Sequence, residues 1–226
     1  MSTSATKLKH STEAGFTLVE IAIVLVIIGL LLGGILKGQE MITQAKIKNL
    51  INDFNGVTVA VTSYQDRYRA LPGDDLNATT RWTVQAPGSG NGDGSVQGLY
   101  NDATATTESH LFWQHLRIAG FVPGPTTGAS AGQLPPNAGG GLIGVESGVS
   151  GTNGMGFTSL IVCFSNLPEK VASAVDGQMD DGVPSSGQVR AQLQATASPP
   201  TATTAAGAAS AYVETGVNQY LMCKNL

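Results

Sequence analysis

The sequence predicts an α+β fold in which a long N-terminal α-helix packs on a small antiparallel β-sheet. Three observations support this expectation. An apolar run from Phe16 to Leu36 leads into an amphipathic stretch, and no proline occurs before residue 72. Residues 81–155 are rich in Gly, Pro, Ser, Thr and Asn, a composition typical of loops. The last third contains short apolar or alternating stretches that are typical of strands.

The long helix is expected to have an apolar part, residues 16–38, and an amphipathic part, residues 39–71. In the second part, apolar side chains recur at spacings of three and four, so that they share one face of the helix. These side chains are Ile47, Leu50, Phe54, Val57, Val61, Tyr64 and Tyr68. Pro72 and Gly73 break the pattern. Residues 72–226 are therefore expected to form a loop-rich globular domain.

The globular domain is expected to contain two short helices and several strands. Residues 107–121 have near-helical apolar spacing with Gly120 as the C-terminal cap, and residues 166–177 predict a helix with Pro168 in its first turn. The strand candidates are residues 156–164, 187–195 and 211–223. Thr196–Ser210 is of low complexity and indicates an exposed connection, with glycosylation of its hydroxyl groups as an alternative.

The composition excludes some functional classes. The chain of 226 residues has 12 basic and 16 acidic side chains and a net charge of −4, so it lacks the basic surface that nucleic-acid binding needs. No H-E-x-x-H zinc motif and no P-loop occurs. We therefore expect no enzymatic activity, and a membrane-tethered hydrolase is the weaker alternative.

The apolar run predicts a helix that spans a membrane. It has about the 20 residues that a bilayer requires, whereas the apolar core of a secretory signal has roughly 7–15. Lys7 and Lys9 precede it, which favours a cytoplasmic N-terminus and an outward-facing C-terminal domain. Glu20 is the one charged residue within this run. A plain membrane anchor does not explain a carboxylate at that position.

The sequence GFTLVE, Gly15–Glu20, followed by the apolar run, closely resembles the N-terminal signature of type IV prepilins and type II secretion pseudopilins. The resemblance implies that residues 1–15 are a leader, which a prepilin peptidase removes by cleavage between Gly15 and Phe16. It also implies N-methylation of Phe16 at the start of the mature chain. Residues 16–38 would then form the membrane and filament-core half of the helix.

The resemblance also implies a role for Glu20 in assembly. In a filament built from such helices, the Glu20 carboxylate of one subunit can pair with the Phe16 amine of its neighbour. The alternative is a glutamate that reaches the membrane surface from a simple anchor. The implied partners are other pilin or pseudopilin subunits, the prepilin peptidase and an inner-membrane assembly platform.

The two cysteines, Cys163 and Cys223, are expected to form a disulfide. An even number of cysteines in an outward-facing domain favours oxidation, and free buried thiols are the alternative. The bond would resemble the C-terminal disulfide loop of many pilins.

Two acidic stretches are candidates for calcium binding, although no cofactor is required. The first offers Asn91, Asp93, Ser95 and Asp102 in a glycine-rich loop that loosely resembles a calcium loop, and the second offers Asp176, Asp180 and Asp181. Major pseudopilins are known for a calcium site in their C-terminal loops. Turn formation by Asp and Asn explains both stretches without a metal ion.

Taken together, the residues and the resemblance predict a structural subunit of a type IV pilus-like or type II secretion pseudopilus filament. A minor pilin that acts as a tip adhesin or binding subunit is the alternative. The chain is expected to cross the inner membrane once, with a periplasmic or extracellular globular domain, before it enters a filament. The expected fold is a pilin-like ladle.

Overall fold

The computed structural model describes residues 15, 17–149, 152–194, 202–203 and 211–226. Most of the expected leader, Phe16 and most of the Thr196–Ser210 connection therefore lie outside the described residues. The chain divides into two compact units, residues 1–42 and residues 43–226. One helix, α1 (Leu18–Tyr68), runs through both.

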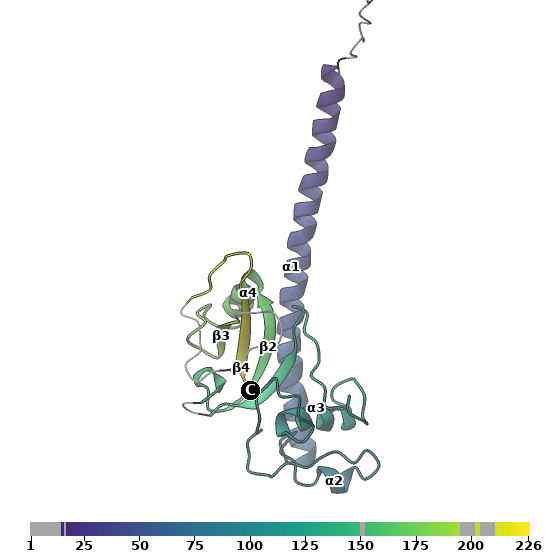
Figure 1. The fold of residues 1–226 in the computed structure, drawn as a ribbon, viewed down its shortest axis with the longest axis vertical. Helices are drawn as coiled ribbons and strands as arrows, with labels where there is room; N and C mark the ends of the chain where they lie inside the picture. Colours follow the sequence, from purple (N-terminus) through teal and green to yellow (C-terminus); the bar gives the residue numbers. More distant parts are fainter. Residues whose placement is uncertain (1–14, 16, 150–151, 195–201, 204–210) are drawn as a thin grey trace, which may run out of the picture. The chain divides into compact units, whose positions relative to one another are not determined.

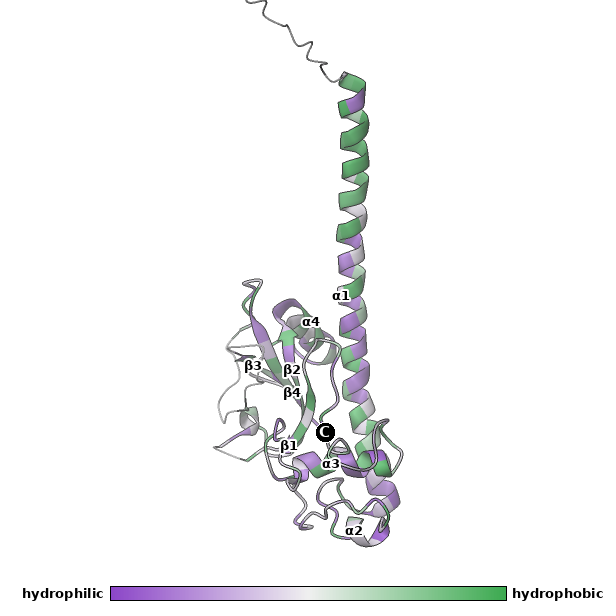
Figure 2. Cartoon of the chain, turned by 45° about the vertical axis from the view of Figure 1, so that its right-hand side comes forward, coloured by the Kyte–Doolittle hydropathy of each residue, from purple (hydrophilic) through white to green (hydrophobic). Residues whose placement is uncertain are grey.

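The part of α1 that belongs to the first unit exposes its apolar side chains. Leucine, isoleucine and valine side chains between Leu18 and Leu36 are exposed on all sides of the helix. Figure 2 shows this half of α1 as an almost unbroken hydrophobic ribbon. By length and composition, α1 is able to cross a membrane. Exposed apolar surface of this extent is typical of a membrane or protein contact.

The part of α1 in the second unit buries the predicted stripe. The buried side chains are Ile47, Leu50, Phe54, Val57, Ala60, Val61 and Tyr64, and Tyr68 is half-buried. The helix ends at Tyr68, three residues before the predicted end. The reason is that Arg69 has a left-handed backbone with φ of 56°, which interrupts the helical path before Pro72.

The second unit contains one four-stranded antiparallel sheet of order β1-β2-β4-β3. Its strands are β1 (Ile143–Ser147), β2 (Leu160–Pro168), β3 (Val189–Gln194) and β4 (Gln219–Asn225). Three strands overlap the predicted segments, whereas β1 was not predicted. The two central strands, β2 and β4, place Cys163 opposite Cys223. The long N-terminal helix and this sheet confirm the predicted α+β class.

The two faces of the sheet bury different clusters because successive strand residues point to opposite sides. Val162 and Phe164 of β2 join the main core, which includes the α1 stripe. Their neighbours Ile161 and Cys163 join a smaller cluster with Tyr100, Met155, Phe157, Leu221 and Cys223. Phe54 of α1 stacks on Phe164 with ring centroids 3.7 Å apart. The C-terminal half of α1 is thereby packed on the sheet, as Figure 1 shows.

The remaining elements are short and surround this core. The helices are α2 (Ala78–Arg81), α3 (Glu108–Ile118) and α4 (Glu169–Met179), with a 3-10 turn at Gly154–Gly156. The two predicted helices correspond to α3 and α4. Gly120 follows α3 with φ of 80°, as expected for a glycine that ends a helix. Pro168 is the N-cap of α4 and lies just outside the first turn.

Candidate functional site

The first turn of α1 contains the predicted assembly residue, Glu20. Its Oε2 accepts hydrogen bonds from the backbone N–H of Thr17 at 2.8 Å and from the Thr17 hydroxyl at 2.7 Å. The Glu20 N–H in turn donates to Thr17 Oγ1 at 3.3 Å. This reciprocal arrangement is a capping box, which satisfies backbone donors at the start of a helix. The T-x-x-E spacing could have identified Thr17 from the sequence.

Gly15 is exposed, and among the described residues nothing lies within 4 Å of the position that a Cβ would take there. The other half of the predicted cleavage site, Phe16, lies outside the described residues. Between Ile21 and Leu36 the helix carries no ionisable side chain. Glu20 is therefore an isolated carboxylate at the N-terminal edge of an exposed apolar surface.

The predicted pair Cys163 and Cys223 forms a disulfide between the two central strands. Both residues are fully buried in the smaller cluster. The bond joins residues that are 60 positions apart and connects β2 to the last strand of the chain.

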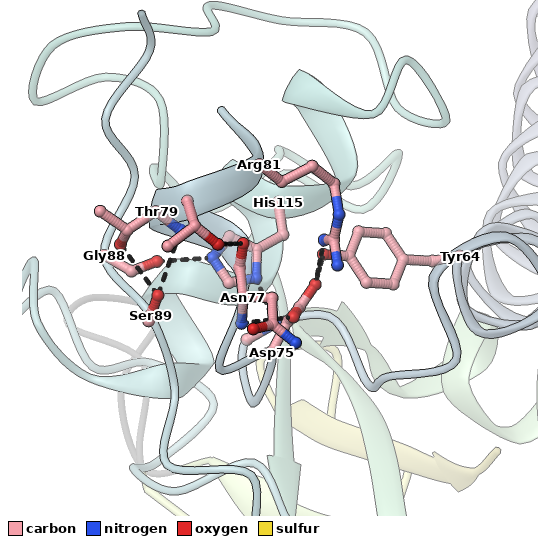
Figure 3. Close-up of polar contacts among 10 residues, drawn as sticks. Tyr64, Asp75, Asn77, Thr79, Arg81, Gly88, Ser89 and His115 are labelled. Carbon is pink, nitrogen blue, oxygen red and sulfur yellow. Dashed lines mark hydrogen bonds and ion pairs between the residues drawn. The ribbon is translucent and has the colours of Figure 1, made fainter. Parts of the chain in front are cut away.

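A buried polar cluster lies where α1 ends (Figure 3). Asp75 is buried, with 1% of its surface exposed. Its Oδ2 accepts a hydrogen bond of 2.7 Å from the Tyr64 hydroxyl and also forms an ion pair with Arg81. Its Oδ1 accepts the backbone N–H of Asn77 at 2.9 Å. Figure 3 shows Tyr64 and Arg81 both directed at this carboxylate. Asp75 thereby ties the loop after α1 to α1 itself and to α2.

His115 of α3 holds the same loop from another side. Its Nδ1 accepts the Gly73 N–H at 2.9 Å, so that Nε2 carries the proton and donates to the Gly88 carbonyl at 2.8 Å. The ring is fully buried and lies parallel to Tyr64, with centroids 6.3 Å apart. Three segments, the end of α1, the loop at Gly73 and the loop at Gly88, therefore meet at one neutral imidazole.

The charges in this cluster shift one another's pKa values. Burial acts to raise the pKa of Asp75, but hydrogen bonds from Arg81, Tyr64 and Asn77 outweigh it and lower the pKa below its usual value. Burial, together with the hydrogen bond to Asp75, raises the pKa of Tyr64. Burial lowers the pKa of His115, against a smaller opposite effect of the Gly88 carbonyl. The cluster thus favours an ionised Asp75 beside a neutral His115.

The first predicted calcium stretch contributes one residue to an acidic group. Carboxylate oxygens of Asp74, Asp93 and Glu108 lie within 4.8 Å of one another. Asn91 donates to Asp93 at 3.0 Å, whereas Asp102 accepts the Thr104 N–H and is not a member of the group. Asp74 and Glu108 come from distant segments, and sequence spacing gave no signal for either of them.

The oxygens of this first group are engaged by backbone donors. Asp74 accepts the N–H groups of Gly92, Asp93 and Gly94 at 2.6–3.1 Å. Glu108 accepts the N–H groups of Asn91 and Gln97 at 2.9 Å. Hydrogen bonds from Ser95 lower the pKa of Asp93 to about 2. These contacts show that the carboxylates shape the glycine-rich loop.

The second predicted stretch forms a different acidic group. Carboxylate oxygens of Asp176, Asp180 and Asp181 lie within 4.8 Å of one another after the end of α4. Asp176 is fully buried; its Oδ2 accepts the Tyr212 hydroxyl at 2.6 Å, but its Oδ1 has no hydrogen-bond partner among the described residues. Burial raises the pKa of Asp176, and the neighbouring charges of Asp181 and Asp180 add to the effect.

Two short glycine patterns that are associated with enzymes lack the required structural context. Gly128–Gly132 reads GASAG, but a nucleophile elbow needs a strand before the serine and a helix after it. The segment is instead a loop between α3 and β1, where Arg117 donates to the Ala131 carbonyl at 2.6 Å. Gly139–Gly144 reads GGGLIG and leads into β1, whereas a dinucleotide fingerprint opens a helix.

Comparison with known proteins identifies the N-terminal part of the chain. A family model described as the prokaryotic N-terminal methylation motif matches residues 10–36. No curated protein and no solved structure gives a significant match. The chain is thus an α+β protein whose long helix and small antiparallel sheet agree with the predicted ladle, and whose N-terminus carries the methylation motif. The motif supports the resemblance of this N-terminus to that of type IV prepilins and pseudopilins, as the sequence predicts.

Proposed function

We propose that the chain is a structural subunit of a type IV pilus-like or type II secretion pseudopilus filament, assembled through its N-terminal helix. The main support is the N-terminal methylation motif, which matches residues 10–36 and includes the exposed apolar part of α1, Leu18–Leu36. A membrane supplies an apolar environment for that helix before assembly, and neighbouring helices supply one afterwards.

The same proposal includes the processing of the chain and its partners. A prepilin peptidase removes residues 1–15 and Phe16 becomes the methylated N-terminus. The inner-membrane assembly platform and other pilin or pseudopilin subunits are the remaining partners. The globular domain of residues 72–226 is periplasmic or extracellular, and the disulfide between Cys163 and Cys223 is compatible with such an oxidising compartment.

Glu20 supplies the electrostatic part of assembly. A new N-terminus at Phe16 carries a positive charge, and leaving this charge unpaired among packed apolar helices costs about 3–5 kcal/mol at each contact. Pairing with the Glu20 carboxylate of a neighbouring subunit removes that cost. Loss of Glu20 should therefore impair assembly but not membrane insertion, because the run becomes more apolar.

The experiment expresses Glu20→Ala with the native assembly machinery and without the parent subunit. We expect normal amounts in the membrane, an N-terminus at N-methylated Phe16 by intact mass, and few sheared filaments. Glu40→Gln is the matched control, because Glu40 is exposed on the same helix and forms a surface ion pair with exposed Lys37 at 2.8 Å. Normal filament yield from Glu20→Ala, or a mature chain that retains residues 1–15, would contradict the proposal.

We further propose that Asp176, Asp180 and Asp181 hold a calcium ion. The supporting observation is the buried Asp176 Oδ1 without a hydrogen-bond partner among the described residues, beside two other carboxylates. Carboxylate oxygens are the ligands that calcium prefers, and a cation would relieve the repulsion within the group. Asp180 and Asp181 also accept hydrogen bonds from nearby N–H groups and from the Ser186 hydroxyl, so the unpartnered Asp176 Oδ1 is what distinguishes this group. The group of Asp74, Asp93 and Glu108 is the weaker candidate, because N–H groups engage its carboxylates and none of their oxygens is a buried atom without a partner.

Calorimetric titration of calcium into the chelator-treated full chain in detergent tests this site. We expect one bound ion in the parent and at least about tenfold weaker binding in Asp181→Asn, whose side chain is exposed. Asp93→Asn is the control and should bind as the parent does. Absence of binding by the parent, or weaker binding in Asp93→Asn alone, would contradict the assignment.

A further inference from the structure

Arg117 of α3 is a buried cation that forms no ion pair with the described residues. Only 7% of its surface is exposed. Its guanidinium donates to the backbone carbonyls of Ser130, Ala131 and Gln133, at 3.4, 2.6 and 2.6 Å. Burial lowers the pKa of Arg117, and no opposite charge among the described residues offsets that effect. Buried charges are normally paired, because neutral groups compensate them only in part.

The remaining parts of the globular unit contain no carboxylate that could supply the missing counterion. Residues 150–151, 195–201 and 204–210, which lie outside the described residues, include neither aspartate nor glutamate. The guanidinium also has more N–H donors than its three carbonyl contacts use. One of these donors, Nε, is buried and has no hydrogen-bond partner among the described residues. Arg117 therefore has both a charge and a donor to offer to a bound group.

A second buried nitrogen without a partner lies on the same face of α3. His110 precedes Arg117 by about two helical turns, so that both side chains leave the helix on one side. His110 is 7% exposed, and its Nδ1 has no hydrogen-bond partner among the described residues. A neutral imidazole with its proton on Nδ1 is a donor at this atom. The two side chains thus provide two unused donors.

Both side chains are covered by the same loop, residues 123–133, and a glycine of the loop faces each unused nitrogen. A Cβ at Gly124 would lie 2.5 Å from Arg117 Nε, and a Cβ at Gly132 would lie 2.1 Å from His110 Nδ1. A side chain at either position would therefore collide with the nitrogen. The space beside Nε is close to the distance at which a hydrogen-bonded oxygen lies. Residues 123–130 are all exposed, so this cover is at the protein surface.

We propose that α3 and the 123–133 loop form a binding site for a small oxyanion, whose oxygens accept hydrogen bonds from Arg117 Nε and His110 Nδ1. A carboxylate or a phosphate has the required chemistry, because each supplies a negative charge and more than one acceptor oxygen. The loop has to move aside for the ion to enter, since both nitrogens are buried. All residues of the site belong to the second unit, so the proposal does not depend on filament assembly.

The test is a titration of acetate, and separately of phosphate, into the full chain in detergent, followed by NMR of arginine labelled with nitrogen-15. Sodium chloride is exchanged for the added salt so that the ionic strength stays constant. The Nε–H signal of Arg117, identified by its absence from Arg117→Lys, should shift until one ion is bound. Tighter binding of acetate would assign the site to a carboxylate, and tighter binding of phosphate would assign it to a phosphate group.

The variants separate the site from the loop. Gly124→Ala fills the space beside Nε, and His110→Phe retains a ring but lacks Nδ1. Each should weaken binding at least about tenfold, the factor expected for one lost hydrogen bond to a charged group. Gly128→Ala is the matched control and should bind as the parent does. Gly128 belongs to the same loop and has a left-handed φ of 74°, but a Cβ there would meet nothing within 4 Å.

Three results would overturn the proposal. An Nε–H signal that neither anion shifts would mean that an ordered water, and no anion, satisfies Arg117. Equal weakening in Gly124→Ala and Gly128→Ala would assign the loss to the loop backbone rather than to the space beside Nε. Parent-level affinity in His110→Phe would exclude the second donor. The two glycine variants and His110→Phe decide the question even if Arg117→Lys, which loses its contacts with the loop, does not fold.

Discussion

Replacement of Asp75 by alanine should destabilise the globular unit by about 3 kcal/mol. The substitution leaves the Tyr64 hydroxyl without its acceptor and Arg81 without its ion-pair partner. Breaking a buried ion pair costs about 3–5 kcal/mol, and the lower end applies because the Arg81 side chain is 25% exposed and can reach water. The Asn77 N–H also loses its acceptor.

Urea unfolding of the full chain in detergent micelles, followed by tryptophan fluorescence, measures this change. Both tryptophans, Trp82 and Trp113, belong to the second unit, so the signal reports on the globular part rather than the apolar helix. Asp66→Ala is the control, because Asp66 is exposed on α1, and it should change the free energy of unfolding by less than about 0.5 kcal/mol. A loss below about 1 kcal/mol for Asp75→Ala would refute the role of Asp75 as the tie between α1 and the loop.

Two further predictions concern stability. Replacement of both Cys163 and Cys223 by alanine should lower the free energy of unfolding by roughly 4 kcal/mol in the loop-entropy model, because the bond closes a loop of 60 residues; an unchanged urea midpoint would contradict this. Burial lowers the pKa of His115, so the unfolded chain binds a proton more readily, and stability should fall below about pH 6.5 by up to about 1.4 kcal/mol per pH unit. His115→Gln should reduce that slope, and an identical slope in the parent and the variant would contradict the assignment. His110, whose pKa burial also lowers, contributes to the slope that remains.

Local sequence patterns predicted the elements in which the buried side chains recur at a regular spacing. The α1 stripe was read correctly because its buried side chains lie at spacings of three and four along one helix. The exact end of α1 was not predicted correctly, because nothing in the local sequence indicates that Arg69 adopts a left-handed backbone conformation. An arginine at that position reads as part of the helix.

The unpredicted strand β1 shows a different limit. It is short, contains Gly144, and places Glu146 in a fully buried position. A glutamate within a strand normally indicates a solvent-facing position. Here the Tyr100 N–H at 2.7 Å and the Thr203 hydroxyl satisfy the carboxylate, although burial still raises its pKa. Both partners are distant in sequence, so no local pattern could have revealed them.

The sequence by itself determined the pilin-type N-terminus, the two halves of the long helix and the pairing of the only two cysteines. The N-terminus and the two halves of the helix depend on contiguous residues, and two cysteines allow one disulfide pairing within the chain. Tertiary structure decided the rest. It brought Asp74 and Glu108 to Asp93, and it set Asp75 against Tyr64 and Arg81. The physical reason is that the environment of a carboxylate depends on which donors and charges the fold brings within hydrogen-bonding distance, and most of those groups are contributed by other segments of the chain.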